Sequence, residues 1–163
     1  MPKDPAPTRS AILAAALQTL KRDGLEGFAI EAVARRAGVA KGLVLYHFKA
    51  RRRLIALCAR SVQTERTRRL TAAVGDGLGA AAADRCWQEL LRQQDDGLAR
   101  AWLGLCAGGI TDRAINDVDF EERARQLLLD GCTAGLAAGV PAGELKDAFD
   151  AVWLALLDVT ETG

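Results

Sequence analysis

The sequence has few of the residues that metal, redox and catalytic sites need. Among its 163 residues it has one histidine, His47, and four cysteines that stand at least 20 positions apart. Zinc and redox motifs need such residues at close spacing, so we expect no metal site and no cofactor. In a chain whose start does not resemble an export signal, isolated cysteines indicate reduced, buried thiols, and we expect a cytoplasmic protein.

Long hydrophobic runs are also missing. No stretch of about 18 uninterrupted apolar residues occurs, so the sequence predicts no membrane-spanning helix. Half of the residues are nevertheless hydrophobic and the mean hydropathy is +0.03, so the chain is not of the disordered class. The length suits one compact domain, or one small domain with an appended module.

Alternation of β-branched and polar residues, the mark of strands, is missing as well. Alanine, leucine, arginine, glutamine and glutamate dominate instead, and they favour helices. The sequence therefore predicts an all-α protein. We expect helices over residues 8–22, with Thr8 as N-cap, and over 30–37, 40–48, 50–74, 80–93, 98–108, 119–139 and 142–160.

The net charge of +1 hides a division of the chain. Residues 1–70 hold 15 basic and 5 acidic residues, hence +10, whereas residues 71–163 hold 7 and 16, hence −9. A basic half joined to an acidic half predicts that only the first half meets a polyanion. The alternative is chance clustering of solvated charge.

Residues 30–48 carry the pattern of a helix-turn-helix. Ala34 is small enough for two helices to cross, and Gly38 can take the positive φ of a tight turn. Five apolar residues would pack both helices against the helix predicted at residues 8–22: Val33, Ala37, Val39, Val44 and Phe48. In such a motif the second helix enters the DNA major groove.

These residues resemble the TetR family of bacterial transcriptional regulators. The resemblance covers about residues 9–58 and includes Ala37-Gly38-Val39, Lys41-Gly42 and the run Tyr46-His47-Phe48-Lys49. It implies a DNA-binding domain at 1–49 and a helical regulatory and dimerisation domain at 50–163, connected by the long fourth helix. It also implies a homodimer that places two recognition helices on a palindromic operator in double-stranded DNA.

The resemblance implies phosphate contacts for Tyr46, His47 and Lys49. We add the arginines that open the fourth helix, because three positive charges there oppose the helix dipole unless phosphates lie nearby. The alternative for them is a solvated face. The predicted DNA-binding residues are Ala40, Lys41, Gly42, Leu43, Leu45, Tyr46, His47, Lys49, Arg51 and Arg52.

The sequence departs from the family pattern at several of these positions. Ala29 and Ala40 replace the usual capping hydroxyls, and Leu43 and Leu45 replace polar residues on the recognition helix. Leucines have no hydrogen-bond donors for base edges, so backbone contact and DNA shape gain importance. Farther along the fourth helix, we expect Arg60, Arg66, Arg68 and Arg69 to face solvent.

The second half carries two weaker predictions. Aromatic and apolar residues there line a ligand cavity or simply form the core: Trp87, Leu91, Trp102, Cys106 and Phe120. Glycines at four-residue spacing let another helix approach closely, either in a four-helix dimer interface or within one subunit. The predicted dimer contacts are Leu128, Gly131, Gly135, Ala138, Phe149, Val152, Trp153 and Leu156.

Taken together, these features predict a homodimeric transcriptional regulator, most simply a repressor released by a small, mainly apolar effector. One alternative is a nonspecific or architectural DNA-binding protein without an inducer, which the two leucines favour. The other is a helical-bundle enzyme. It would need a nucleophile, carboxylate pair or metal cluster that we do not find in the sequence, so we predict that the chain is not an enzyme.

Overall fold

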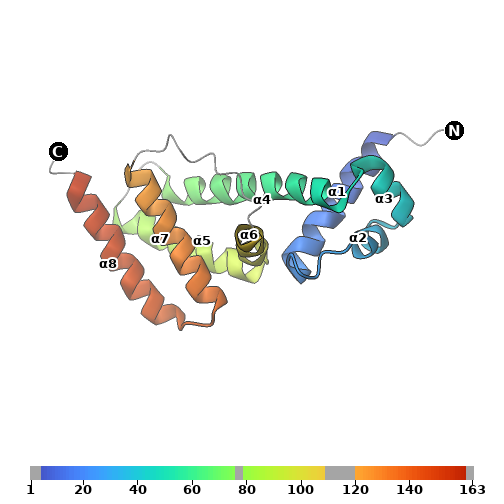
Figure 1. The fold of residues 1–163 in the computed structure, drawn as a ribbon. Coiled ribbons are helices and arrows are strands. Elements are labelled where there is room, and N and C mark those ends of the chain that lie inside the picture. The colour runs from blue at the N-terminus through green and yellow to red at the C-terminus, as the bar shows by residue number, and fades with distance from the viewer. Residues whose placement is uncertain (1–4, 76–78, 109–119, 161–163) are drawn as a thin grey trace. The chain divides into compact units, whose positions relative to one another are not determined.

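The computed structural model describes residues 5–75, 79–108 and 120–160, and their side chains over 8–75, 79–108 and 125–154. All regular structure in these ranges is α-helical (Figure 1). The helices are α1 (Pro5–Asp23), α2 (Ile30–Ala37), α3 (Lys41–Phe48), α4 (Arg51–Val74), α5 (Ala80–Asp95), α6 (Leu98–Ala107), α7 (Phe120–Ala137) and α8 (Ala142–Thr160).

The helix boundaries follow the sequence predictions closely, with one clear exception. α1 begins at Pro5, so Thr8 lies inside the helix and is not its N-cap. Proline is tolerated in a first turn because its missing N–H has no intrahelical acceptor there. The helix ends as predicted, since Gly24 follows it with a φ of 69°.

The chain divides into two compact units, which we describe separately. The first comprises Met1–Glu65 and Arg100–Thr111, and the second comprises Arg66–Ala99 and Asp112–Gly163. The division therefore falls within α4 and within α6. The family resemblance implies a different boundary, after residue 49, between a DNA-binding and a regulatory domain. That boundary stays a prediction.

The first unit is built on α1, α2 and α3, which pack against one another and against the start of α4. Ile12, Leu20, Val33 and Leu54 are fully buried there. α6 contributes from far along the sequence, because its Arg100 donates from Nη1 to the backbone oxygen of Arg22 at 2.6 Å. The turn after α1 is thus held in place by a residue nearly 80 positions away.

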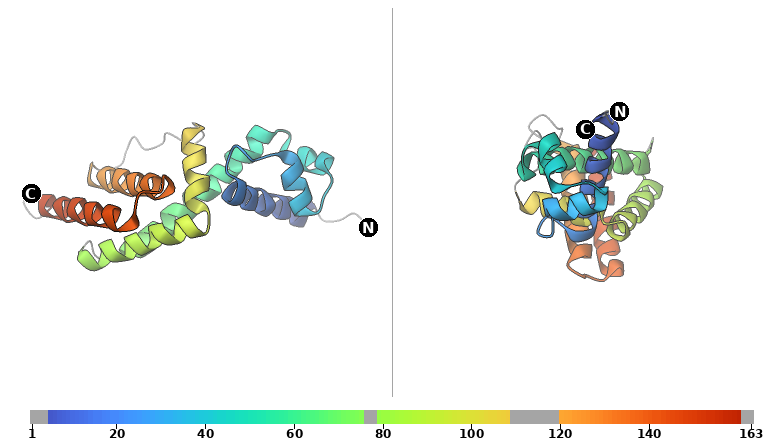
Figure 2. Two further views of the ribbon diagram at one scale, coloured as in Figure 1. Left: turned by 90° about the horizontal axis from the view of Figure 1, so that it is seen from below. Right: turned by 90° about the vertical axis from the view of Figure 1, so that its right-hand side faces the viewer.

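The second unit has its core between α4, α5, α7 and α8. Phe149 lies at its centre, with its ring centroid 5.6 Å from that of Trp87 and 5.4 Å from that of Trp153. α7 and α8 run side by side in opposite directions (Figures 1 and 2). The other core residues are Leu70, Ala73, Ala82, Ala83, Cys86, Leu90, Leu129 and Cys132.

Arg66 corrects the expectation that the later arginines of α4 face solvent, since its side chain is only 2% exposed. It donates from Nη2 to Asp130 on α7 at 2.6 Å and from Nη1 to Gln93 on α5 at 3.3 Å. Periodicity could not reveal this, because an arginine on a long helix is buried only where neighbouring helices bring acceptors to it.

The predicted burial of the cysteines is confirmed for three of the four. Cys58, Cys86 and Cys132 are buried, as expected, but Cys106 is exposed. Burial raises the pKa of the Cys58 thiol to about 12 and that of Cys86 to about 11. Within the described ranges no group of three potential metal ligands occurs, and no helix there is long and apolar enough to cross a membrane.

Candidate nucleic-acid interface

The helix-turn-helix is formed by α2 and α3 with a three-residue turn between them. Gly38 caps α2 in the left-handed conformation, with φ 66° and ψ 31°. The N–H of Val39 then reaches back to the oxygen of Ala34 at 3.0 Å and closes the helix end. A side chain at position 38 would be strained, so this turn depends on glycine.

The inward face of the motif is apolar and closely packed. Val44 is fully buried, Phe48 is 1% exposed and Ala34 is 4% exposed. Arg9 from α1 lies over the Phe48 ring, with its guanidinium carbon 5.2 Å from the ring centroid. Because these contacts fix one side of α3, the opposite side is presented as a rigid surface.

The outward face of α3 carries most of the predicted DNA-binding residues. Tyr46 is 68% exposed, so it is not part of the core, and Leu43 is 37% exposed. Leu45 and His47 are half-buried and therefore offer less surface to a ligand than the other members. Ala40, Lys41, Gly42, Lys49, Arg52 and Arg53 are exposed.

Both helices of the motif begin without a side-chain cap. Ala29 and Ala40 stand at the two N-cap positions and make no side-chain hydrogen bond. Nothing lies within 4 Å of where a Cβ at Gly42 would stand, so the first turn of α3 is open. Backbone N–H groups at such a helix start can donate to a phosphate.

Lys49 joins α3 to α4 in a strained backbone conformation. Its φ of 65° and ψ of −42° form a tight turn, in which the N–H of Ala50 bonds to the oxygen of Phe48 at 2.7 Å. The Lys49 ammonium lies 5.1 Å from the centroid of the Tyr46 ring. The turn thus brings the lysine and the exposed tyrosine to the same side of the motif.

Lys41 at the start of α3 is paired within the motif. Its Nζ lies 2.5 Å from Oε1 of Glu31 on α2, and both side chains are more than half exposed. The hydrogen bond from Lys41 lowers the pKa of the Glu31 carboxyl. Sequence reasoning missed Glu31, because a pair ten positions apart becomes visible only once the two helices are docked.

The three arginines that open α4 have different surroundings. Arg51 is exposed but donates from Nε to the oxygen of Phe28 at 2.8 Å and from Nη2 to that of Leu25 at 3.2 Å. Arg52 and Arg53 make no hydrogen bond or ion pair with the described part of the chain. Arg51 thus has backbone partners within the chain, and phosphate contacts by the three arginines stay a prediction.

The residues predicted to bind a ligand are not brought together. Trp87 is buried in the core of the second unit, Trp102 is buried in the first and Cys106 is exposed. Leu91 packs on the core cluster, and the Phe120 side chain lies outside the described residues. Two cavities of the second unit, one between α4 and α5 and one between α4, α7 and α8, are lined by none of the four side chains that the structure describes.

The predicted dimer residues separate into an inner and an outer group. Phe149 and Trp153 belong to the core of the protomer, and a Cβ on Gly135 would lie 2.9 Å from Cδ2 of Leu145 in the same chain. Leu128 packs on that core too, and the Leu156 side chain lies outside the described residues. The exposed members are Gly131, Ala138 and Val152.

The first unit therefore has the fold and exposed basic surface of a helix-turn-helix DNA-binding domain. Residues 12–58 match the family model of bacterial regulatory proteins of the tetR family. Among curated proteins, no sequence matches the chain.

Solved structures extend the likeness beyond the motif. The multidrug binding protein EbrR, solved with imidazole, has a TM-score of 0.66 at 20% identity, over 91% of this chain and 90% of its own. A gamma-butyrolactone receptor described as ArpA-like has a TM-score of 0.57 at 19% identity, with 94% and 98% covered. A transcriptional regulator from Rhodococcus sp. Rha1 has 0.55 at 23%, with 92% and 96% covered.

At these identities the structures show a shared fold, and the family match is confined to residues 12–58. The chain thus combines an N-terminal helix-turn-helix segment that matches the tetR-family model with a helical C-terminal part that shares the fold of the solved structures.

Proposed function

We propose that the protein is a homodimeric repressor that binds a palindromic operator and dissociates from it when a small effector binds the C-terminal unit. The observation that carries the DNA-binding part is the exposed group Lys41, Tyr46, Lys49, Arg52 and Arg53, mounted on the packed motif. Hydroxyl, ammonium and guanidinium groups on one rigid face are suited to phosphate contacts along a groove.

The small-molecule part rests on two kinds of support. One similar structure is a multidrug binding protein with imidazole and another is a gamma-butyrolactone receptor, so this fold accommodates small ligands. In addition, α4 runs without a break from Arg51, beside the candidate DNA surface, to Val74 in the second unit. A ligand that displaces α4 would change the separation of two recognition helices, which must remain near one DNA turn, about 34 Å.

The homodimer would form through the exposed face of α7 and α8. Leu127, Gly131 and Ala134 stand at i, i+4 and i+7 on α7, and Val152 is exposed on α8. An apolar, small-residue face of this kind allows close packing of helices from two subunits. This interface therefore omits Phe149, Trp153 and Gly135.

The second candidate is a nonspecific DNA-binding protein. It is favoured by Leu43, which is exposed where a donor to base edges would be useful. The two functions differ in selectivity, because a regulator prefers its operator over random DNA by about 10³-fold or more at one salt concentration.

The deciding experiment is footprinting on DNA upstream of the protein's own gene, followed by competition with random duplex. We expect a protected palindrome and a preference of about 10³-fold. The variant Arg52→Gln/Arg53→Gln should reduce the slope of log K against log salt by about 0.9 for each lost contact. Arg60→Gln, an exposed arginine farther along α4, is the matched control. Equal affinity for all duplexes would support the nonspecific protein, and an unchanged slope would remove these arginines from the interface.

A further inference from the structure

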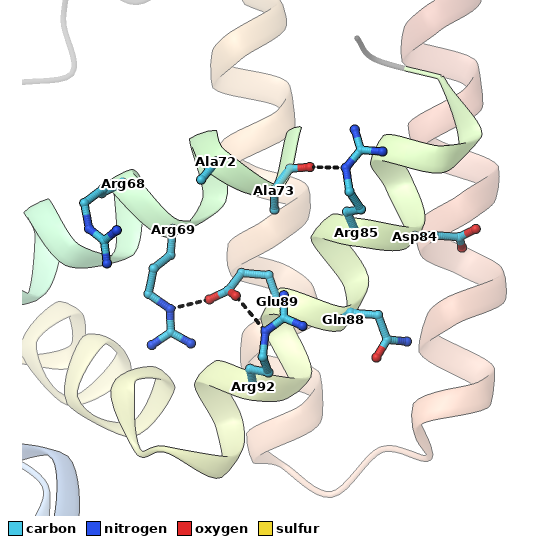
Figure 3. A pocket seen from close by; sticks show the side chains of 9 residues that line it. All are labelled: Arg68, Arg69, Ala72, Ala73, Asp84, Arg85, Gln88, Glu89 and Arg92. Atoms are coloured by element: carbon cyan, nitrogen blue, oxygen red, sulfur yellow. Dashed lines mark hydrogen bonds and ion pairs between the residues drawn. The ribbon is translucent and has the colours of Figure 1, made fainter. Parts of the chain in front are cut away.

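The second unit contains a cavity whose chemistry differs from the apolar site that the sequence predicts. It has a volume of about 490 Å³ and lies between α4 and α5. Figure 3 shows its lining, which comprises Arg68, Arg69, Ala72, Ala73, Asp84, Arg85, Gln88, Glu89 and Arg92. Four arginines and two carboxylates line it, and two of these arginines, Arg85 and Arg92, come from residues 71–163, which carry a charge of −9 from 7 basic and 16 acidic residues.

Glu89 holds two of these arginines in place. One carboxylate oxygen accepts from Nε of Arg69 at 2.5 Å, and the other accepts from Nε of Arg92 at 3.0 Å. Glu89 itself is buried and also accepts from Gln93 at 3.0 Å. Because both arginines use Nε for Glu89, the terminal ends of their guanidinium groups are left to other partners (Figure 3).

Those terminal nitrogens have spare hydrogen-bond capacity. Neither Nη of Arg92 bonds to the described part of the chain, and Arg69 uses only Nη1, toward Asp96. Arg85 donates from Nε to the oxygen of Ala73 and from Nη2 to that of Val74, each at 2.8 Å, which leaves its Nη1. A guanidinium has five donors and no acceptor, so these groups can serve only acceptors, preferably anionic ones.

The carboxylates of the lining do not compete for these donors. Glu89 is engaged as described, and Asp84 points away from it, with its Oδ1 2.9 Å from Nζ of Lys146 on α8 (Figure 3). Ala72 and Ala73 keep the α4 side of the cavity free of bulk. A space of this volume is within the range that small-molecule sites occupy.

We propose that this cavity binds a small polyanion carrying carboxylate or phosphate groups, and that such an anion is the effector of the regulator. The effector role rests on the function proposed above, whereas the binding site does not. Planar guanidinium ends fixed by a buried carboxylate are prepared for bidentate contact with an oxyanion, and little side-chain entropy is lost when it binds.

The test is titration calorimetry of the full chain with citrate and, separately, with pyrophosphate. The two probes distinguish a polycarboxylate site from a phosphate site. We expect saturable binding of at least one of them, and no binding of triethyl citrate, the neutral ester. Arg68→Gln/Arg92→Gln, which removes two exposed arginines of the lining, should weaken binding at least tenfold.

Two further variants test whether the anion binds in this cavity. Ala72→Leu fills the cavity without removing charge and should also weaken binding. Arg52→Gln/Arg53→Gln, in the DNA-binding unit, should bind the anion as the parent chain does while its salt-dependent DNA binding falls. Binding that is unaffected by the cavity variants, or equal binding of the neutral ester, would overturn the anion site. Loss of DNA selectivity alone would overturn only the proposed function.

Discussion

Nε of Arg51 lies 2.8 Å from the backbone oxygen of Phe28, so the first turn of α4 is bound to the segment that leads into the helix-turn-helix. The guanidinium carbon also lies 5.8 Å from the centroid of the Phe28 ring. A basic residue at the start of a helix is unfavourable for the helix dipole. Here two backbone carbonyls, those of Phe28 and Leu25, supply the compensation that the sequence assigns to DNA phosphates.

We expect Arg51→Ala to reduce stability and Arg52→Ala to reduce DNA affinity. Loss of charged hydrogen bonds at a partly exposed site should cost about 1–2 kcal/mol. Thermal unfolding followed by circular dichroism measures this cost, and Arg52→Ala should unfold within about 0.5 kcal/mol of the parent. Equal stability of the two variants would contradict a structural role for the Arg51 hydrogen bonds.

Lys49→Gly should make the protein more stable and a weaker DNA binder at the same time. Glycine adopts the φ of 65° without steric cost, so relief of strain should contribute about 1 kcal/mol. Loss of the ammonium should reduce the salt slope of DNA binding by about 0.9. The control is Ala50→Gly, where φ is not positive and glycine should only destabilise. A destabilised Lys49→Gly would show that the cation–π contact outweighs the strain.

Arg66→Met should destabilise the second unit strongly. It leaves Asp130 on α7 and Gln93 on α5 without their central donor, and breaking such a buried pair from one side costs about 3–5 kcal/mol. Asp130 is one-third exposed, so we expect the lower end of this range. Urea unfolding measures the loss, and Arg66→Met/Asp130→Leu should recover part of it. If the double variant recovers no stability, the broken Arg66–Asp130 pair does not explain the destabilisation of Arg66→Met.

The stability that Glu89 contributes should disappear in acid. Burial alone would raise the pKa of its carboxyl, but hydrogen bonds from Gln93, Arg92 and Arg69 outweigh burial and hold the pKa below its ordinary value of 4.5. A depressed folded-state pKa stabilises the fold above the unfolded-state value, and this contribution is lost as the pH falls through the folded-state value.

We therefore expect Glu89→Gln to be less stable than the parent in urea at pH 7, and the difference to shrink below about pH 4. Asp147→Asn, an exposed change on α8, should stay within about 0.5 kcal/mol of the parent. A Glu89→Gln deficit that is the same at pH 7 and pH 3 would contradict the assigned ion pairs.

Charge placed on the outer face of α7 and α8 should separate the proposed dimer without unfolding the protomer. Leu127 is 67% exposed and Val152 is 45% exposed, so Leu127→Lys and Val152→Lys each leave the core intact. Sedimentation should show monomers for these variants and dimers for Ala56→Lys, an exposed change on α4. Dimers in all three cases would locate the subunit contact elsewhere.

Most of the fold could be predicted because its signals are local. Helix ends at Gly24 and Gly38 follow from the positive φ that glycine tolerates, and the apolar spacing of Val33, Val44 and Phe48 predicts which face of the motif is buried. The predicted first helix starts at residue 8, three residues late, because a first turn that contains two prolines has no distinct sequence signal.

Contacts between side chains that lie far apart in the sequence could not be predicted. Trp87, Phe149 and Trp153 have the composition of a cavity or an interface, yet they pack on one another across α5 and α8. In the sequence, Arg85 and Arg92 are indistinguishable from solvated charge, although Arg85, Glu89 and Arg92 share one helical face at spacings of four and three. That spacing is the available signal for the polar cavity.

Helix propensity, charge and short-range spacing are properties of neighbouring residues. For that reason the sequence is enough to predict a helical chain, a basic first half and a helix-turn-helix at residues 30–48. The role of each arginine, in contrast, depends on how the helices pack. Arg51 binds backbone carbonyls, Arg66 is buried beside Asp130, and Arg92 lines a cavity, whereas Arg52 remains open to DNA. Their chemistry is identical, and the acceptors that the folded chain brings to each guanidinium distinguish them.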